Sequence, residues 1–268
     1  MEKSYASCSI TPLIPLIGSG NPFCLLIFPG EARAEIQSRL SSDIPVLYLQ
    51  GACGNTSTRN FAESQYSSDF DMRACCERTG RMIGEKALMA MADKTSHDAN
   101  AKSSCERRIL QVPARHRGPE DMSLYEAHEF LSMHPNGASQ DDGRYNPELW
   151  KRYWADSVVM LEGAVPFRDT YPMELSLFRL GNLAIVTNPG ELFVEYQLDV
   201  KRQSPFPNTM VVELANGYCG YIPTELAFKN GGYETRLARS SYLSFEAGRI
   251  WVDNAVRLLH GQSMENSK

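Results

Sequence analysis

The sequence lacks several patterns that would assign it at once to a common class. Its seven cysteines are an odd number and include no Cys-x-x-Cys pair, so neither a disulfide framework nor a cysteine zinc site is expected. Its five histidines include no His-x-His or His-x-x-x-His pair, so we expect no two-histidine metal cluster. The sequence also has no Gly-x-Ser-x-Gly motif, which argues against a serine hydrolase of the nucleophile-elbow type.

An excess of basic residues and a long apolar run are also missing. The chain has 27 Lys and Arg against 32 Asp and Glu, so no basic field indicates a nucleic acid or an anionic membrane as partner. The most apolar stretch, residues 10–29, is interrupted by prolines and glycines, which is untypical of a transmembrane helix. No clear basic region precedes it, as a signal peptide would require. We therefore expect a soluble protein without a transmembrane segment, in which residues 1–29 form an atypical N-terminal segment.

The rest of the sequence is that of an ordinary globular domain. Hydrophobic residues make up 43% of the 268 positions, enough to bury a substantial core. Apolar residues at helical spacing predict helices over 30–40, 69–92, 191–202 and 241–260, two more within 119–164, and a short one over 225–229. Apolar or alternating runs predict strands over 44–49, 107–113, 171–180, 183–186 and 210–214.

This order of elements predicts an α/β fold. Helices and strands alternate along the chain, which favours a mixed β-sheet core flanked by helices. The two helices within 119–164 are joined by a Gly- and Asp-rich linker over 135–143 and are expected to form a helical hairpin inserted between strands. The hairpin could cover or build a groove on the sheet.

Gly51–Ser57 is a loop of small residues that follows the strand expected over 44–49. Glycines there would let the backbone approach a ligand closely and leave N–H groups free for an anion. Ser57 could then act as a nucleophile if a neighbouring group removed its proton. A serine that only hydrogen-bonds within its own turn is the simpler interpretation. Cys53 is a rival nucleophile, although a cysteine beside a strand is more often buried and inert.

Two further motifs place chemistry-bearing residues at the ends of strands. In Thr187–Phe193, Glu191 follows a Pro-Gly turn and could be an oxygen ligand, a general base or an acid that stabilises a helix N-terminus. In the loop after residue 214, Tyr221 and Tyr233 flank the short helix. A tyrosine can bind a metal or donate to an oxyanion, but aromatic packing is an equally open explanation for either ring.

Taken in chain order, these motifs resemble one known family. Leu47–Ser57, Asn188–Glu191, and Gly217–Thr224 continuing to Gly232–Glu234 resemble the neutral/alkaline non-lysosomal ceramidases, and the resemblance is closest to bacterial ceramidase-like proteins. It extends over most of the chain, from about residue 28 to 259. Three motifs in the same order are more specific than any one of them.

The resemblance implies an α/β catalytic domain with its site at the strand ends. It implies a zinc-dependent amidase that cleaves the N-acyl bond of ceramide, releasing sphingosine and a fatty acid. Ser57 then matches the family's nucleophile, Glu191 and Tyr221 match zinc ligands, and Tyr233 matches the tyrosine that holds the oxyanion. Asn55 departs from the family, which has an aspartate there, and removes a charge that could help to order the loop.

The resemblance also implies two histidine zinc ligands upstream, and this sequence has no histidine before His97. Residues 30–262 therefore resemble the C-terminal part of a ceramidase catalytic domain, as a truncation or a frame error would leave it. Two oxygen ligands are fewer than the about three protein ligands usual for catalytic zinc. Two functions stay open: a zinc amidohydrolase acting on ceramide or another N-acyl amine, and a non-catalytic relic or binding protein. Members of the family are often exported.

Overall fold

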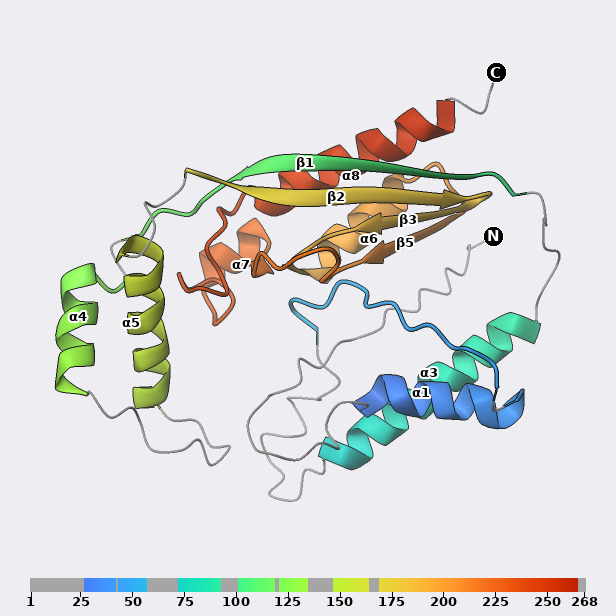
Figure 1. The fold of residues 1–268 in the computed structure, drawn as a ribbon, viewed down its shortest axis with the longest axis horizontal. Coiled ribbons are helices and arrows are strands. Elements are labelled where there is room, and N and C mark those ends of the chain that lie inside the picture. The colour runs from blue at the N-terminus through green and yellow to red at the C-terminus, as the bar shows by residue number, and fades with distance from the viewer. Residues whose placement is uncertain are drawn as a thin grey trace.

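The computed structural model describes residues 27–41, 43–56, 72–92, 101–118, 121–134, 147–163 and 169–264. The helices in these ranges are α1 (Ile27–Arg39), α3 (Met72–Ala92), α4 (Leu124–Met133), α5 (Pro147–Gly163), α6 (Val194–Gln203), α7 (Glu225–Asn230) and α8 (Ala247–Met264). The strands are β1 (Ser103–Pro113), β2 (Thr170–Leu180), β3 (Leu183–Thr187), β4 (Glu191–Leu192), β5 (Asn208–Val212) and β6 (Tyr221–Ile222). Figure 1 shows their arrangement.

The main sheet has four strands in the order β1-β2-β3-β5. The first three strands are antiparallel neighbours, and β2 turns into β3 at Gly181, whose φ is +56°. β5 runs parallel to β3, which requires a crossover, and α6 provides it. The predicted mixed α/β sheet is therefore confirmed, and so is the β-hairpin expected over 171–186.

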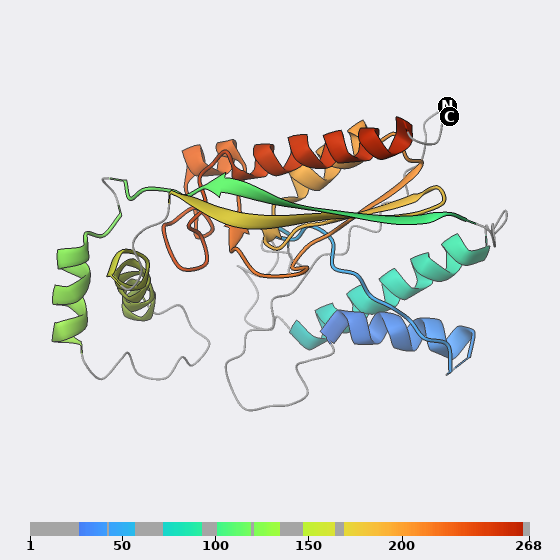
Figure 2. The same ribbon diagram turned by 45° about the horizontal axis from the view of Figure 1, so that its top comes forward.

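The core lies between this sheet and two helices. α6 and α8 run along the same face of the sheet (Figures 1 and 2). Alternate residues of β2, namely Met173, Leu175 and Leu177, are almost fully buried, as expected for the inner face of a strand with period two. Trp251 on α8 is completely buried and its indole N–H donates to the carbonyl of Thr187 at 3.2 Å. This bond ties α8 to the end of β3.

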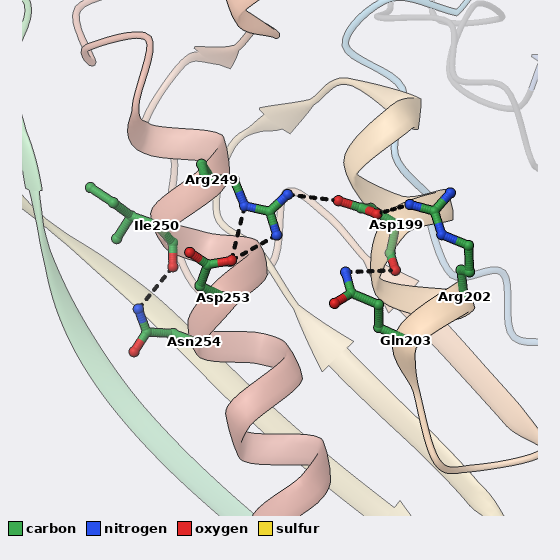
Figure 3. Close-up of polar contacts among 7 residues, drawn as sticks. All are labelled: Asp199, Arg202, Gln203, Arg249, Ile250, Asp253 and Asn254. Carbon is green, nitrogen blue, oxygen red and sulfur yellow. Dashed lines mark hydrogen bonds and ion pairs between the residues drawn. The ribbon is translucent and has the colours of Figure 1, made fainter.

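Charged side chains join α6 and α8 at the surface (Figure 3). Arg249 donates to Asp253 one turn later on α8 and to Asp199 on α6, at 2.7–2.9 Å. Arg202 contacts the other oxygen of Asp199. Half of the Arg249 side chain is exposed, and exposed ion pairs contribute about 0–1 kcal/mol each. The buried apolar faces of the two helices therefore contribute more to their packing than this network does.

Two helical pairs flank the sheet. α1 and α3 pack against each other beyond β5 (Figure 1), where Gly80 of α3 lies so close to α1 that a Cβ would meet the Phe28 carbonyl oxygen at 2.5 Å. The predicted hairpin, α4 and α5, stands beyond the end of the strands where β1 stops and β2 starts (Figure 1). It has its own small core, with Ala127 and Ala155 fully buried. No helix within the described ranges is long and apolar enough to cross a membrane.

One predicted element is wrong. Residues 44–49 form no strand, because no described strand pairs with the segment, and Leu47 is 81% exposed. The helix expected over 191–202 is confirmed with a later start, at Val194, since Glu191 and Leu192 form β4. The other helices and strands are confirmed with shifted bounds; β1 begins four residues earlier than expected and α8 six residues later. The linker over 135–143 and most of the segment 1–29 lie outside the described residues.

Candidate functional site

A second, two-stranded sheet is formed by the segments that follow the ends of β3 and β5. β4 and β6 run parallel, with Glu191 opposite Tyr221 and Leu192 opposite Ile222. Backbone bonds from Glu191 N–H to the Gly220 carbonyl (2.9 Å) and from Phe193 N–H to the Ile222 carbonyl (3.2 Å) hold them together. Both strands are buried. The carboxylate and the phenol that the sequence singled out are thus register partners, and ligand sites in α/β sheets commonly lie at this end of the strands.

Glu191 is a buried acid with one of its two carboxylate oxygens unpaired. It is 4% exposed, and its Oε1 accepts a bond from the Tyr218 hydroxyl at 2.9 Å. Its Oε2 is buried without a hydrogen-bond partner. Burial raises the pKa of Glu191, and Glu234 adds to the rise, whereas the hydrogen bond from Tyr218 and the nearby phenol of Tyr221 oppose it. A buried carboxylate oxygen without a partner is costly, which indicates a position prepared for a cation or a donor.

Aromatic rings continue outward from this carboxylate. Tyr221 is 6% exposed and meets Tyr233 edge-on, with 5.7 Å between ring centroids. Tyr233 is 39% exposed and meets Trp150 of α5 edge-on at 5.1 Å. Burial raises the pKa of both tyrosines, and the nearby Glu191 carboxylate raises it further. Both phenols are therefore neutral donors at ordinary pH when no metal ion is bound.

The Gly51–Thr56 part of the small-residue loop is fastened to β4 and α6. Ala52 N–H donates to the buried amide of Gln197 at 2.8 Å. Asn55 accepts from Val194 N–H at the start of α6 (2.8 Å) and donates to the Glu195 carboxylate (2.8 Å). An aspartate could accept the first bond but would repel Glu195, so here the amide orders the loop. Ser57 lies outside the described residues, and its role stays a prediction.

Glu213, just after β5, joins this loop to β4. It is 2% exposed, and its Oε2 accepts from the N–H groups of Cys53 and Leu192, each at 2.9 Å. The Cys53 thiol donates to its Oε1. Burial raises the pKa of Glu213 to about 8, and burial together with Glu213 raises that of Cys53. Cys53 is therefore a protonated structural thiol, which removes it as a rival nucleophile.

Gly54 allows the loop to reach β4. Its N–H donates to the Leu192 carbonyl at 2.9 Å, and an added Cβ would lie 2.3 Å from the Glu191 carbonyl oxygen. Gly54→Ala must push the loop away from β4, so we expect a loss of about 1–3 kcal/mol in the free energy of unfolding. Gly261→Ala is the matched control, because no atom lies within 4 Å of its added Cβ on α8. It should gain about 0.5–1 kcal/mol.

Denaturant unfolding of the two variants beside the wild-type chain checks this prediction. If Gly54→Ala is as stable as the wild type, the close packing of the loop on β4 is not a feature of the protein in solution.

The donor set partly suits a divalent metal ion. Glu191 Oε2 is an unpaired buried oxygen, and Tyr221 supplies a phenol whose pKa a bound metal would lower. Carboxylate and phenol oxygens are acceptable zinc ligands, but catalytic zinc usually has about three protein ligands. Within the described part of the chain, no group of three His, Cys, Asp or Glu side chains could hold a metal. Glu191 and Tyr221 can thus form part of a metal shell.

The structure brings three of the four predicted site residues together: Glu191, Tyr221 and Tyr233. Sequence reasoning did not assign a role to Tyr218, which bonds the carboxylate directly. The sequence feature that could have pointed to Tyr218 is the pair of flanking glycines, Gly217 and Gly220. Their φ values of +155° and +75° let the chain turn back. Sequence reasoning also missed Glu213, because nothing in a strand-end glutamate reveals a partner 160 residues away.

Comparison with known proteins finds a match in structure alone. No protein-family model and no curated protein matches the sequence. The fold is similar to the crystal structure of neutral ceramidase from Pseudomonas aeruginosa, with a TM-score of 0.50 and 18% identity over 87% of this chain and 41% of that one. It is also similar to a structure described as ceramidase complexed with C2, with a TM-score of 0.51 and 18% identity over 87% and 42%. The chain thus has the fold of part of a ceramidase and spans less than half the length of either structure.

Proposed function

We propose that this chain, which has the fold of part of a neutral ceramidase, carries the site of a ceramidase-like amidohydrolase. Its substrate would be ceramide or a related N-acyl amine. The observation that carries the proposal is the unpaired, buried Oε2 of Glu191, which lies beside the phenol of its register partner Tyr221. A fold alone does not define an activity, but this oxygen lies at the end of the strands where such folds place chemistry.

The reaction would be hydrolysis of an amide. The bond between the acyl carbon and nitrogen breaks, water supplies a hydroxyl group to the acyl carbon, and the amine leaves with a proton. The neutral phenol of Tyr233, partly exposed beside Tyr221, would donate to the oxygen of the acyl carbon as negative charge develops there. Ser57 would be the nucleophile, as the resemblance implies: its oxygen would bond to the acyl carbon while the amine leaves with the serine proton. Water would then break this ester, which gives the free acid and restores the serine hydroxyl.

Glu191 and Tyr221 would be two of the ligands of a bound metal ion. When bound, zinc would supply polarisation of the acyl carbonyl and activation of the attacking oxygen. Tyr218 would keep the Glu191 carboxylate in place through its hydrogen bond of 2.9 Å. The acidic and phenolic surroundings of Glu191, with Glu234 nearby, favour a cation over an anion at this point.

Release of fatty acid tests the proposal. The purified chain is incubated with ceramide whose acyl chain carries a fluorophore, in the presence of zinc or of a chelator, and the free labelled acid is measured. We expect release with zinc and loss of release with the chelator. Binding of the labelled ceramide, measured by fluorescence anisotropy, without any release under either condition would contradict the proposal and favour a non-catalytic binding protein.

A further inference from the structure

A fourth tyrosine reaches the site from the helical hairpin. Tyr153 on α5 donates from its hydroxyl to Oγ of Ser240 at 2.7 Å. Tyr233 lies against the same two residues. Its ring meets Trp150, one turn before Tyr153 on α5, with 5.1 Å between centroids. Besides burial, the neighbouring Tyr153 raises the pKa of Tyr233, and hydrogen bonding from Ser240 lowers it. The three hydroxyl groups therefore lie together, next to the ring of Tyr221.

Ser240 fixes this cluster to β6. Its carbonyl accepts from Tyr221 N–H at 2.8 Å. Gly220 packs directly against it, because an added Cβ there would lie 2.5 Å from the Ser240 carbonyl oxygen. The neighbouring Ser241 is held as well, since its hydroxyl donates to the Glu234 carbonyl. The backbone of Ser240 is thus tied to the candidate metal ligand Tyr221, and its side chain is tied to the phenol of Tyr233.

Side chains of α5 and of the 233–240 loop hold the hairpin in this place. Trp150 meets Tyr233 edge-on at 5.1 Å. The guanidinium of Arg236 lies 4.1 Å from the ring centroid of Trp154, and that of Arg239 lies 4.8 Å from the centroid of Tyr153. Cations over aromatic faces are attractive at these distances. The orientation of α5 is therefore coupled to the loop that carries Tyr233.

We propose that Tyr153 is a positioning residue that orients the phenol of Tyr233 through Ser240, so that the α4–α5 hairpin is part of the site. This inference rests on the proposed role of Tyr233 as the donor to the acyl oxygen. A free phenol rotates about its side-chain bonds, whereas one held by two fixed hydroxyl groups keeps its donor direction. Misplacement of a catalytic group by about 1 Å can cost about 100-fold in rate.

Tyr153→Phe tests the proposal. It removes the hydroxyl and keeps the ring under Arg239, so the fold should survive. We expect kcat for fatty acid release from labelled ceramide to fall about 10- to 100-fold, with KM within about twofold of wild type. Ser240→Ala should have a similar effect, and the double variant should be no worse than the worse single one, because both act through one linkage. Tyr125→Phe is the control, since Tyr125 lies on α4 of the same hairpin and is 75% exposed. It should leave kcat unchanged.

The outcomes separate this inference from the proposed function. If the wild-type chain is active and Tyr153→Phe keeps full kcat, the positioning role alone is overturned. The same holds if Tyr153→Phe and Ser240→Ala lose kcat only in proportion to a fall in their melting temperature. A wild-type chain without release would remove the proposed function. The link between the hydroxyl groups is then tested by melting temperature. If the shift in the double variant equals the sum of the shifts in Tyr153→Phe and Ser240→Ala, the link is overturned. A smaller shift in the double variant supports it.

Discussion

Replacing Glu191 by glutamine is expected to lower fatty acid release by about 10- to 100-fold or more and to leave the protein folded. Loss of an outer partner of a metal ligand costs about 10–100-fold in metal affinity or activity, and loss of the ligand itself should cost no less. Glutamine has the same shape and keeps an oxygen that can accept from Tyr218. It removes the negative charge, and it can place an N–H₂ donor where Glu191 now has an unpaired oxygen.

Stability distinguishes a lost ligand from a damaged fold. Burial raises the pKa of Glu191, so its charged form is disfavoured in the metal-free protein. The glutamine variant should therefore be as stable as the metal-free wild type, or more stable. Glu246→Gln, at an exposed carboxyl group, is the matched control and should keep both activity and bound zinc. Full activity in Glu191→Gln, or equal zinc content by elemental analysis, would show that Glu191 is not a ligand.

Glu213 is expected to make the protein less stable as the pH rises from about 5 to 8. Burial raises its folded pKa to about 8, against about 4.3 in an unfolded chain. Between these values the folded protein holds a proton that the unfolded chain has released. The contribution of Glu213 to stability is complete below its pKa in the unfolded chain. It is lost as the pH rises through its pKa in the folded protein. The slope from this one group is about 1.4 kcal/mol per pH unit.

Glu213→Gln should flatten this part of the profile. Its amide oxygen can still accept from the N–H groups of Cys53 and Leu192, and it has no proton to release. Denaturant unfolding at pH 5, 6, 7 and 8, compared with the wild type and with the exposed Glu246→Gln, measures the difference in slope. Glu213→Leu should cost about 2–5 kcal/mol at pH 5, since it leaves two buried N–H groups without an acceptor. If wild type and Glu213→Gln have parallel profiles, Glu213 does not titrate in this range.

The regular elements were predictable because their patterns are local. The apolar spacing of α3 and α8 and the alternation of β2 follow from period alone. Glu191 was misplaced because an acid after Pro-Gly and before an apolar run is also typical of a helix start. β4 forms only because β6, thirty residues later in the chain, offers a parallel partner. The strand expected over 44–49 failed for the opposite reason, since no described strand pairs with it.

The candidate site was predictable only in part. Glu191, Tyr221 and Tyr233 were found from short motifs whose residues lie near strand ends. Tyr153 was not predicted, because a tyrosine at an apolar position of a helix indicates core packing and not a role in a site. Its bond to Ser240 spans 87 residues of sequence. Such a contact depends on how the inserted hairpin docks, which no local pattern specifies.

The candidate site exists in only one register of β4 against β6. Successive side chains of a strand point to opposite faces, so a slip of one residue between these two strands would place Ile222 or Gly220 opposite Glu191 and turn the phenol of Tyr221 to the other side. Gly54, Gly190 and Gly220 pack so closely around the pair that each lacks room for a methyl group. Any insertion or deletion between residues 191 and 221 must therefore preserve this register.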